Sequence, residues 1–423
     1  MLLFFGGGSA AATAATAAVG TTNQSFRSSF TYGGKINWFP GHMIKATKQL
    51  KENIKNVDVV LEIRDSRAPL STENPLLQDI LRQTFKDGAK KTHIVVFNKA
   101  DMSNHNLQSK IKLYYDQYNR LTEDRAYNKH IAFTQSASKT NSAATTHQSH
   151  PRHPYQVIKN AVELHRQQQD KLQQQQQQQE NNNNNNKIID TTIIDRKQMK
   201  KEINMLVIGV PNVGKSSLIN SIRNACRMTK SAKTGALPGV TRNITGFRVS
   251  DDPPAFLVDT PGIMIPGVLE DVERALTLSL VGAISEKIVD HTVVADYLLF
   301  KMNQMRITTY VTVLKLDAPT DDINRLLEHI CQLKGMYLTN QQQFQQIKLN
   351  NDRLNSNKTN DTEQASRYLI NLFREGKFGN FTLDKIPSPP TSLDQIIITT
   401  PNTLEILQQQ QQQQSKDQLI NEK

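Results

Sequence analysis

A glycine-rich turn between two apolar segments constrains the fold of this chain more than any other feature. Residues 209–216 read Gly-Val-Pro-Asn-Val-Gly-Lys-Ser, after an apolar run at 203–208 and before an amphipathic segment at 216–226. A strand that leads into such a turn and then into a helix is typical of a phosphate-binding loop, where backbone N–H groups and the helix N-terminus attract phosphate. The pattern therefore predicts an α/β domain with a parallel sheet and helices on both faces.

Oxygen-bearing side chains around this loop suit a magnesium ion. The Lys215 ammonium would reach the terminal phosphates, and the Ser216 hydroxyl would bind Mg²⁺. Asp259 follows an apolar run at 256–258 and would hold the same ion through a water. Thr241 would complete the shell of Mg²⁺, unless it is an ordinary surface-loop threonine. The residues expected to contact the phosphates or the ion are Asn212, Val213, Gly214, Lys215, Ser216, Ser217, Thr241, Asp259 and Gly262.

A second motif, Asn98-Lys99-Ala100-Asp101, suits recognition of guanine. The Asp101 carboxylate can accept hydrogen bonds from the N1–H and the 2-amino group of guanine, and adenine lacks this pair of donors. The Lys99 stem can lie along the base, and Ser136 and Ala137 can offer a backbone N–H to its O6 atom. The phosphate loop usually precedes the base-reading motif, but here it follows. This reversed order predicts a circularly permuted domain.

The composition along the chain divides it into five parts. Residues 1–35 are rich in Ala, Gly, Ser and Thr, and no acidic residue precedes Glu52. This composition favours a mitochondrial transit peptide, with a retained disordered tail as the alternative. We expect a nucleotide-binding domain at 36–266, interrupted by a flexible Gln/Asn insert at 167–187, then a mainly helical domain at 267–390 and a disordered tail at 391–423.

The helical domain is expected to contain helices at 270–300, 322–335 and 364–376. Between them, the region 301–320 is either a break between helices or a small inserted strand. No stretch approaches the ~20 apolar residues of a membrane-spanning helix. Two cysteines form no metal-binding motif and indicate a reducing compartment. The formal charge of +12 indicates either a polyanionic partner, RNA or an anionic membrane surface, or a basic composition suited to a basic-tolerant organelle.

Six stretches together resemble the circularly permuted GTPases that assemble the large ribosomal subunit, above all the mitochondrial ribosome-associated members and their bacterial counterparts. The likeness spans roughly residues 36–384. It is carried by the guanine motif, the phosphate loop, Asp259-Thr260-Pro261-Gly262, and the stretches at 38–43 (Trp-Phe-Pro-Gly-His-Met), 65–69 (Asp-Ser-Arg-Ala-Pro) and 373–379. The resemblance implies a circularly permuted P-loop GTPase domain followed by a mainly helical C-terminal domain.

The resemblance also implies an activity and partners. It implies hydrolysis of GTP to GDP with Mg²⁺, and contact with rRNA and proteins of the mitochondrial large ribosomal subunit, in the matrix or on the matrix side of the inner membrane. It implies neither DNA binding nor an obligate oligomer. Arg374 and Lys377 are candidate contacts to rRNA; the alternative is that they form a solvated helix end. Two alternatives stay open: a GTP-binding scaffold at the inner membrane that regulates translation without hydrolysis, and a P-loop ATPase, with which Asp101 conflicts.

Two residues are candidates for assisting hydrolysis, because Ile263 stands where many GTPases have a water-orienting glutamine. The resemblance offers His42 for the positioning of water; its alternative role is an anchor packed beside Trp38. It also offers Asn212 as a ligand of K⁺, whose charge would act on the phosphates; the alternative is an asparagine that favours a turn. Together with Thr241, these residues form the candidate catalytic set.

Overall fold

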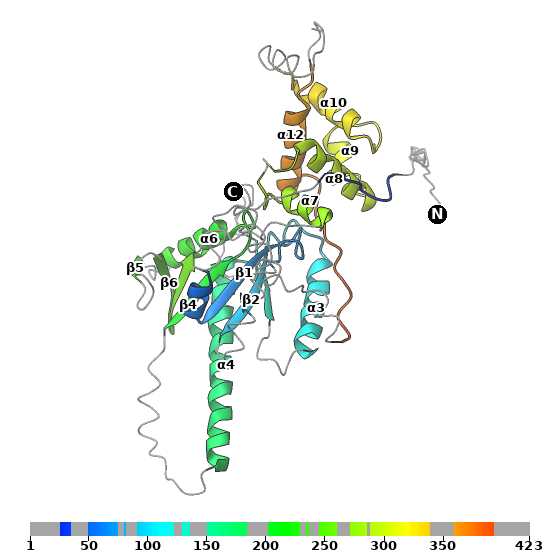
Figure 1. Cartoon of the computed structure of the whole chain (residues 1–423). Helices are drawn as coiled ribbons and strands as arrows, with labels where there is room; N and C mark the ends of the chain where they lie inside the picture. Colours follow the sequence, from blue (N-terminus) through cyan, green and yellow to red (C-terminus); the bar gives the residue numbers. More distant parts are fainter. Residues whose placement is uncertain are drawn as a thin grey trace, which may run out of the picture.

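The computed structural model describes residues 26–34, 50–74, 80–81, 91–121, 129–135, 150–183, 202–228, 234–236, 245–259, 271–285, 288–338 and 359–392. Its centre is a seven-stranded sheet with the strand order β3-β2-β1-β4-β7-β6-β5 (Figure 1). The strands are β1 (Val59–Asp65), β2 (Thr92–Asn98), β3 (Lys129–Phe133), β4 (Ile203–Ile208), β5 (Thr234–Ala236), β6 (Thr245–Asp251) and β7 (Pro254–Asp259).

The sheet is mixed rather than wholly parallel. The strands from β3 to β7 in this spatial order are parallel, which confirms the predicted core of the sheet, whereas β6 and β5 run antiparallel at one edge. The prediction lacks these two edge strands. The signal for β6 is present in the sequence, because the buried Phe247 and Val249 alternate with the half-buried Arg248 and Ser250. Such alternation is typical of a strand with one solvated face.

Helices cover both faces of the sheet, as predicted. Alternate residues of a strand point to opposite faces. On β2, Val95 and Phe97 pack with α3 (Leu107–Leu121), whereas Ile94 and Val96 belong to the core that includes α4 (Pro154–Asn183). Therefore α3 and α4 lie on opposite faces. Helix α6 (Lys215–Met228) contacts α4 and β6, and so lies on the same face as α4.

The long helix α4 differs from the expected flexible insert. It continues through most of the glutamine tract to Asn183 and extends away from the sheet (Figure 1). Its first half is anchored, because Val157, Ile158 and Ala161 are buried in the main core. Glutamine is a good helix former, so a helix that is already nucleated by packing can propagate into the tract.

The region after the sheet is helical, as expected, and the bounds of its helices differ from those predicted. The helices are α7 (Val272–Leu280), α8 (His291–Gln304), α9 (Thr309–Val313), α10 (Ile323–Lys334) and α12 (Thr362–Arg374). The single helix expected at 270–300 is two, because Gly282 adopts a left-handed φ of 78° and the Asp290 carboxylate caps a new helix through the Thr292 N–H. The unassigned region 301–320 contains α9 rather than a strand.

A short N-terminal segment, residues 26–34, packs on the helical region and is called the strap below. The Arg27 guanidinium donates to the Asp296 carboxylate at 2.7 Å, and the Arg27 backbone N–H donates to Asp321 at 2.7 Å. The Phe30 ring meets Tyr297 edge-on with centroids 5.2 Å apart. Residues 26–34 are thus packed on the helical region, unlike the disordered tail that was the alternative expected for residues 1–35. Residues 1–25 and 393–423 lie outside the described residues.

None of the helices in the described ranges has the length and apolar character that crossing a bilayer would require.

Candidate nucleotide-binding site

The base-reading motif and the phosphate loop are in direct contact, although the loop comes later in the chain. The Asn98 side-chain amide donates to the Val213 carbonyl at 2.9 Å, and Lys99 Nζ donates to the Asn212 carbonyl at 2.9 Å. The sheet explains this meeting, because β2 and β4 are both neighbours of β1 and end at the same edge. Ligands bind at this edge in open α/β sheets.

Backbone conformation is restricted on both sides of this contact. Lys99 and Asn212 have left-handed φ angles of 58° and 59°, which non-glycine residues adopt at a cost and which cluster at functional sites. Steric constraints also explain why two positions of the phosphate loop are glycines. A Cβ on Gly209 would collide with the Ile63 carbonyl, and a Cβ on Gly214 would collide with the Asn98 amide. The loop can approach the neighbouring segments this closely only because it carries glycine there.

The phosphate loop leads into the N-terminus of α6, and such a helix end attracts an anion. The helix begins at Lys215. The Leu218 N–H donates back to the carbonyl of Gly214, the residue just before the helix. The N–H groups of the first turn have no partner within a helix, and the helix dipole favours negative charge there. Ser216 and Ser217 are exposed in this turn, whereas Lys215 is buried and its Nζ donates to the Val210 carbonyl at 2.8 Å.

The positions expected to hold Mg²⁺ fit an oxygen-bound ion. Strands β4 and β7 are paired, with Val207 opposite Asp259, so the end of β7 lies beside the strand that leads into the phosphate loop. Ser216 is in the first turn of α6, and a hydroxyl with a carboxylate is a donor set that Mg²⁺ prefers. No cluster of three or more His, Cys, Asp or Glu residues suited to a metal occurs among the residues that the structure describes.

Part of the predicted site falls outside the described residues. This holds for His42, Ser136, Ala137, Thr241 and Gly262, and for the side chain of Asp259. The remaining predicted residues are Asn98, Lys99, Ala100, Asp101, Asn212, Val213, Gly214, Lys215, Ser216 and Ser217, and the structure describes all of them. The base-reading turn is tied to the next strand, because the Ala100 N–H donates to the Thr134 carbonyl at 3.0 Å.

Asp65, at the end of β1, is a site residue to which the sequence prediction assigned no role. Its carboxylate is fully buried and accepts from Lys99 Nζ at 2.7 Å and from Arg67 Nε and Nη2 at 3.0 and 2.8 Å. Burial would raise the pKa of Asp65, but Arg67 and Lys99 outweigh this effect and hold it well below its usual range. Burial lowers the pKa of Lys99, and Asp65 opposes that shift. The sequence signal that could have identified Asp65 is its position as a charged residue at the end of the apolar run that forms β1, the strand beside β2.

The helical region contacts both motifs. Asn212 donates from its side-chain amide to the Gly282 carbonyl at 2.6 Å, which leaves its amide oxygen for other ligands. Arg67 Nη1 donates to the Arg374 carbonyl at 3.2 Å. The Arg374 guanidinium, expected as an RNA contact, donates to the carbonyls of Leu280 and Ser279 at 3.0 Å each. Arg374 therefore joins α7 to α12 within the protein.

After α12, the chain returns to the loop that follows β1. The Leu383 N–H donates to the Arg67 carbonyl at 2.7 Å. The Asp384 carboxylate accepts from the backbone N–H groups of Leu70 and Ser71 at 2.7 and 2.8 Å. The helical region and the sheet are thus joined at the loop that follows β1.

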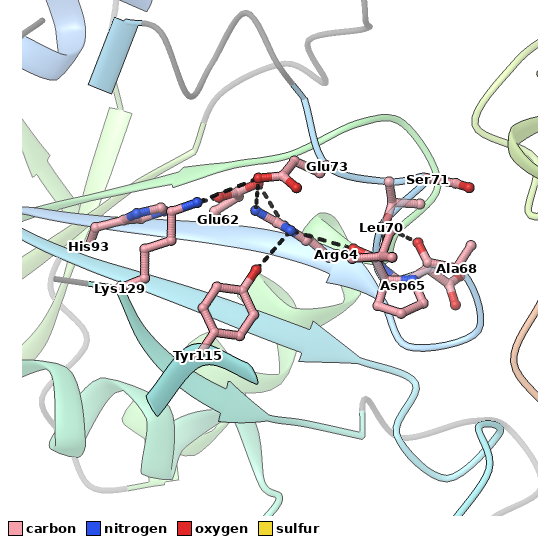
Figure 2. A network of polar contacts seen from close by, with 12 residues as sticks. Glu62, Arg64, Asp65, Ala68, Leu70, Ser71, Glu73, His93, Tyr115 and Lys129 are labelled. Carbon is pink, nitrogen blue, oxygen red and sulfur yellow. Dashed lines mark hydrogen bonds and ion pairs between the residues drawn. The ribbon is translucent and has the colours of Figure 1, made fainter. Parts of the chain in front are cut away.

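A buried ionic network joins β1, β2, β3 and the same loop (Figure 2). Arg64 donates from Nε to Glu62 at 2.8 Å and from Nη2 to Glu73 at 2.9 Å. His93 Nε2 lies 3.0 Å from Glu62, and Lys129 Nζ lies 3.5 Å from Glu73. Burial would raise the pKa of Glu62, but Arg64 and His93 lower it, and burial lowers the pKa of His93. The network therefore pairs two carboxylates with two cations and fastens the loop to the sheet.

Comparisons with known proteins identify relatives of this chain. A family described as 50S ribosome-binding GTPase matches residues 204–341. The chain is 32% identical to mitochondrial ribosome-associated GTPase 1 of Xenopus tropicalis, over 85% of this chain and 98% of that protein. It is 31% identical to mitochondrial GTPase 1 of Schizosaccharomyces pombe, over 85% of this chain and 93% of that protein.

A mouse relative and a solved structure are also similar. Mitochondrial ribosome-associated GTPase 1 of Mus musculus is 31% identical, over 87% of this chain and 96% of that protein. The solved structure is GNP-bound YlqF from T. maritima, at 16% identity and a TM-score of 0.44, covering 81% of this chain and 99% of that one. With its phosphate loop, its guanine motif and these full-length relatives, the chain belongs to the family of mitochondrial ribosome-associated GTPase 1.

Proposed function

We propose that this GTPase binds guanine nucleotide where residues 98–101 meet residues 209–217, and that it acts in assembly of the mitochondrial large ribosomal subunit and so supports mitochondrial translation. The observation that carries the nucleotide site is the pair of hydrogen bonds from Asn98 and Lys99 to the carbonyls of the phosphate loop. A single bound nucleotide would contact both segments, with its base at one and its phosphates at the other.

The residues divide the work by chemistry. Asp101 accepts the two hydrogen bonds that distinguish guanine from adenine, and Ser136 and Ala137 are proposed to offer a backbone N–H to O6. Lys99 lies along the base. The backbone N–H groups of residues 212–217 hold the phosphates, with Lys215 on the terminal ones. The N–H of Gly262 is proposed to sense the terminal phosphate and to be released after hydrolysis.

Two cations fit this arrangement. Ser216, Thr241 and Asp259 would hold Mg²⁺, which neutralises phosphate charge when bound. The amide oxygen of Asn212 would hold K⁺, since its amide nitrogen is engaged by the Gly282 carbonyl and turns the oxygen away from that partner. His42 is proposed to position the attacking water, because Ile263 cannot accept or donate a hydrogen bond.

The partner follows from charge and from the relatives. The chain carries a formal charge of +12, which favours RNA through its phosphates. Relatives covering most of the chain are named mitochondrial and ribosome-associated. We place the protein in the mitochondrial matrix, on rRNA and proteins of the large subunit, with any contact to the inner membrane peripheral.

The first expected result concerns turnover. Purified chain in potassium buffer with Mg²⁺ should hydrolyse GTP slowly, and mitochondrial large subunits should accelerate it by about tenfold or more, because the partner completes an incomplete water-positioning site. Released phosphate is measured with large subunits, with small subunits as the matched control, and with sodium replacing potassium.

His42→Ala provides the internal comparison. It should lower subunit-stimulated turnover by roughly 10²-fold, the typical contribution of one positioned acid–base group, while GTP affinity changes little. Equal turnover with and without large subunits would instead favour the non-hydrolysing scaffold. Tighter binding of ATP than of GTP would favour an ATPase.

The strap makes a second prediction, about import. If an N-terminal leader is removed in the mitochondrion, the cut should lie before Arg27, because Arg27 and Phe30 are bound by the helical region in the folded protein. N-terminal sequencing of the protein isolated from mitochondria checks this. A mature form that begins within or after the strap would contradict it.

A further inference from the structure

Asp65 connects the side chain proposed to lie along guanine with a residue of the neighbouring loop. One carboxylate oxygen, Oδ2, accepts from both Lys99 Nζ at 2.7 Å and Arg67 Nη2 at 2.8 Å. The other, Oδ1, accepts from Arg67 Nε at 3.0 Å and from the Arg67 N–H at 2.9 Å. Asp65 and Arg67 are almost completely buried. Water therefore screens this three-residue contact weakly, and the position of each charge affects the others strongly.

The guanidinium of Arg67 also ends against the last turn of α12. Nη1 donates to the Arg374 carbonyl at 3.2 Å and contacts the Phe373 carbonyl at 3.5 Å, and the guanidinium lies 5.0 Å from the centroid of the Phe373 ring. These carbonyls belong to the C-terminal end of a helix, where they carry partial negative charge, and the Phe373 carbonyl also accepts from the Gly376 N–H at 2.9 Å. Arg67 is therefore shared between Asp65 and α12.

The same turn of α12 approaches the phosphate loop by another route. The Arg374 guanidinium donates to the carbonyls of Ser279 and Leu280, just before Gly282. The Gly282 carbonyl accepts from the Asn212 side chain at 2.6 Å. Both halves of the nucleotide site are thus connected to the end of α12. The base-reading motif is connected through Asp65 and Arg67, and the phosphate loop through Gly282.

We infer that Asp65 and Arg67 are positioning residues for Lys99, and that through them the last turn of α12 sets the affinity for guanine nucleotide. This inference rests on the proposed function, in which Lys99 lies along the base. Arg67 and Lys99 both bond to the Asp65 carboxylate and together neutralise it. Lys99 can therefore stay at the base without being the only partner of Asp65. When Arg67 is lost, neither the Asp65 carboxylate nor the Lys99 ammonium bonded to it is held in place by Arg67. By linkage, nucleotide binding also stabilises the end of α12.

A double-mutant cycle on the full chain tests the inference. GDP affinity is measured by calorimetry for wild type, Arg67→Gln, Lys99→Ala and the double variant. We expect Arg67→Gln to weaken GDP binding roughly tenfold, and we expect the double variant to bind like Lys99→Ala alone, because Arg67 acts through Lys99. Wild-type affinity in Arg67→Gln, or independent effects that multiply, would overturn the inference while leaving the proposed function intact. Failure of wild type to bind GDP would overturn the proposed function and the inference with it.

A second pair of variants tests the α12 end without touching the buried charges. Gly376 follows α12 with φ 75°, and Gly335 follows α10 with φ 68°, so alanine strains both turns similarly. Gly376→Ala should weaken GDP binding several-fold, roughly 3–10-fold for a coupling of this size. Gly335→Ala, at a position with open space around it, should leave the affinity unchanged. Equal affinity in the two variants would overturn the role of α12.

Hydrogen exchange gives a readout that a purely structural role would not move. The amides of Glu375, Gly376 and Lys377 donate to carbonyls of the last turn of α12. GDP should slow their exchange in wild type and should not do so in Arg67→Gln. Equal protection in both proteins would overturn the linkage.

Discussion

Lys215→Ala is expected to lower the affinity for GTP and GDP by at least about 100-fold, because it removes charge-assisted hydrogen bonds to phosphate worth ~1.5–3 kcal/mol each. The ammonium is buried inside its own loop and donates to the Val210 carbonyl, so it is held at the loop before any nucleotide arrives. Fluorescence titration with a labelled GDP, confirmed by calorimetry, measures the effect.

The control for this variant is Lys334→Ala, which removes the same charge from the exposed end of α10. It should bind nucleotide like wild type. Gly214→Ala adds a test of geometry, since its Cβ would collide with the Asn98 amide and separate the two motifs. Near-wild-type GDP affinity in Lys215→Ala would refute the phosphate role of this loop.

Arg64→Met is expected to reduce the free energy of unfolding by about 3–5 kcal/mol, because removal of one partner leaves a buried charge uncompensated. Arg64 is fully buried and serves both Glu62 and Glu73, and methionine retains much of its volume without the charge. Urea unfolding followed by circular dichroism at pH 7.5 measures the change.

An exposed ion pair offers the matched comparison. Arg367 and Glu363 lie one turn apart on α12, with 2.6 Å between Arg367 Nη2 and Glu363 Oε1. Their side chains are 53% and 65% exposed. Arg367→Met should change the free energy of unfolding by less than about 0.5 kcal/mol, since water screens such pairs. Adding Glu62→Gln to Arg64→Met should recover part of the loss. Similar small effects for both arginines would contradict the structural role of the network.

The ionic network around Arg64 also affects the nucleotide site, because it holds the loop after β1. Glu73 is fastened by the network, and the Arg274 guanidinium from α7 donates to the carbonyls of Ser71 and Glu73. Arg67, which shares the Asp65 carboxylate with Lys99, therefore lies in a loop that is fixed from the sheet on one side and from the helical region on the other.

Much of the fold was predictable because its signals are local. The buried strands β1, β2, β4 and β7 are short apolar runs, and the phosphate loop is marked by two glycines and a lysine at set spacing. The break between α7 and α8 was missed although Gly282 and Asp290 mark it. The helical part of the glutamine tract was missed because polar composition was given more weight than the helix that precedes it.

The sequence by itself determined the family, the two nucleotide motifs and their reversed order, because these depend on residue types at fixed short spacings. Only the tertiary structure decided which polar groups far apart in the sequence bond to one another. Arg67 and the Arg374 carbonyl it contacts are 307 residues apart, and the strap meets its acidic partners across 269 residues or more. Such contacts arise from how the helical region packs against the edge of the sheet, and no local pattern of polarity specifies that packing.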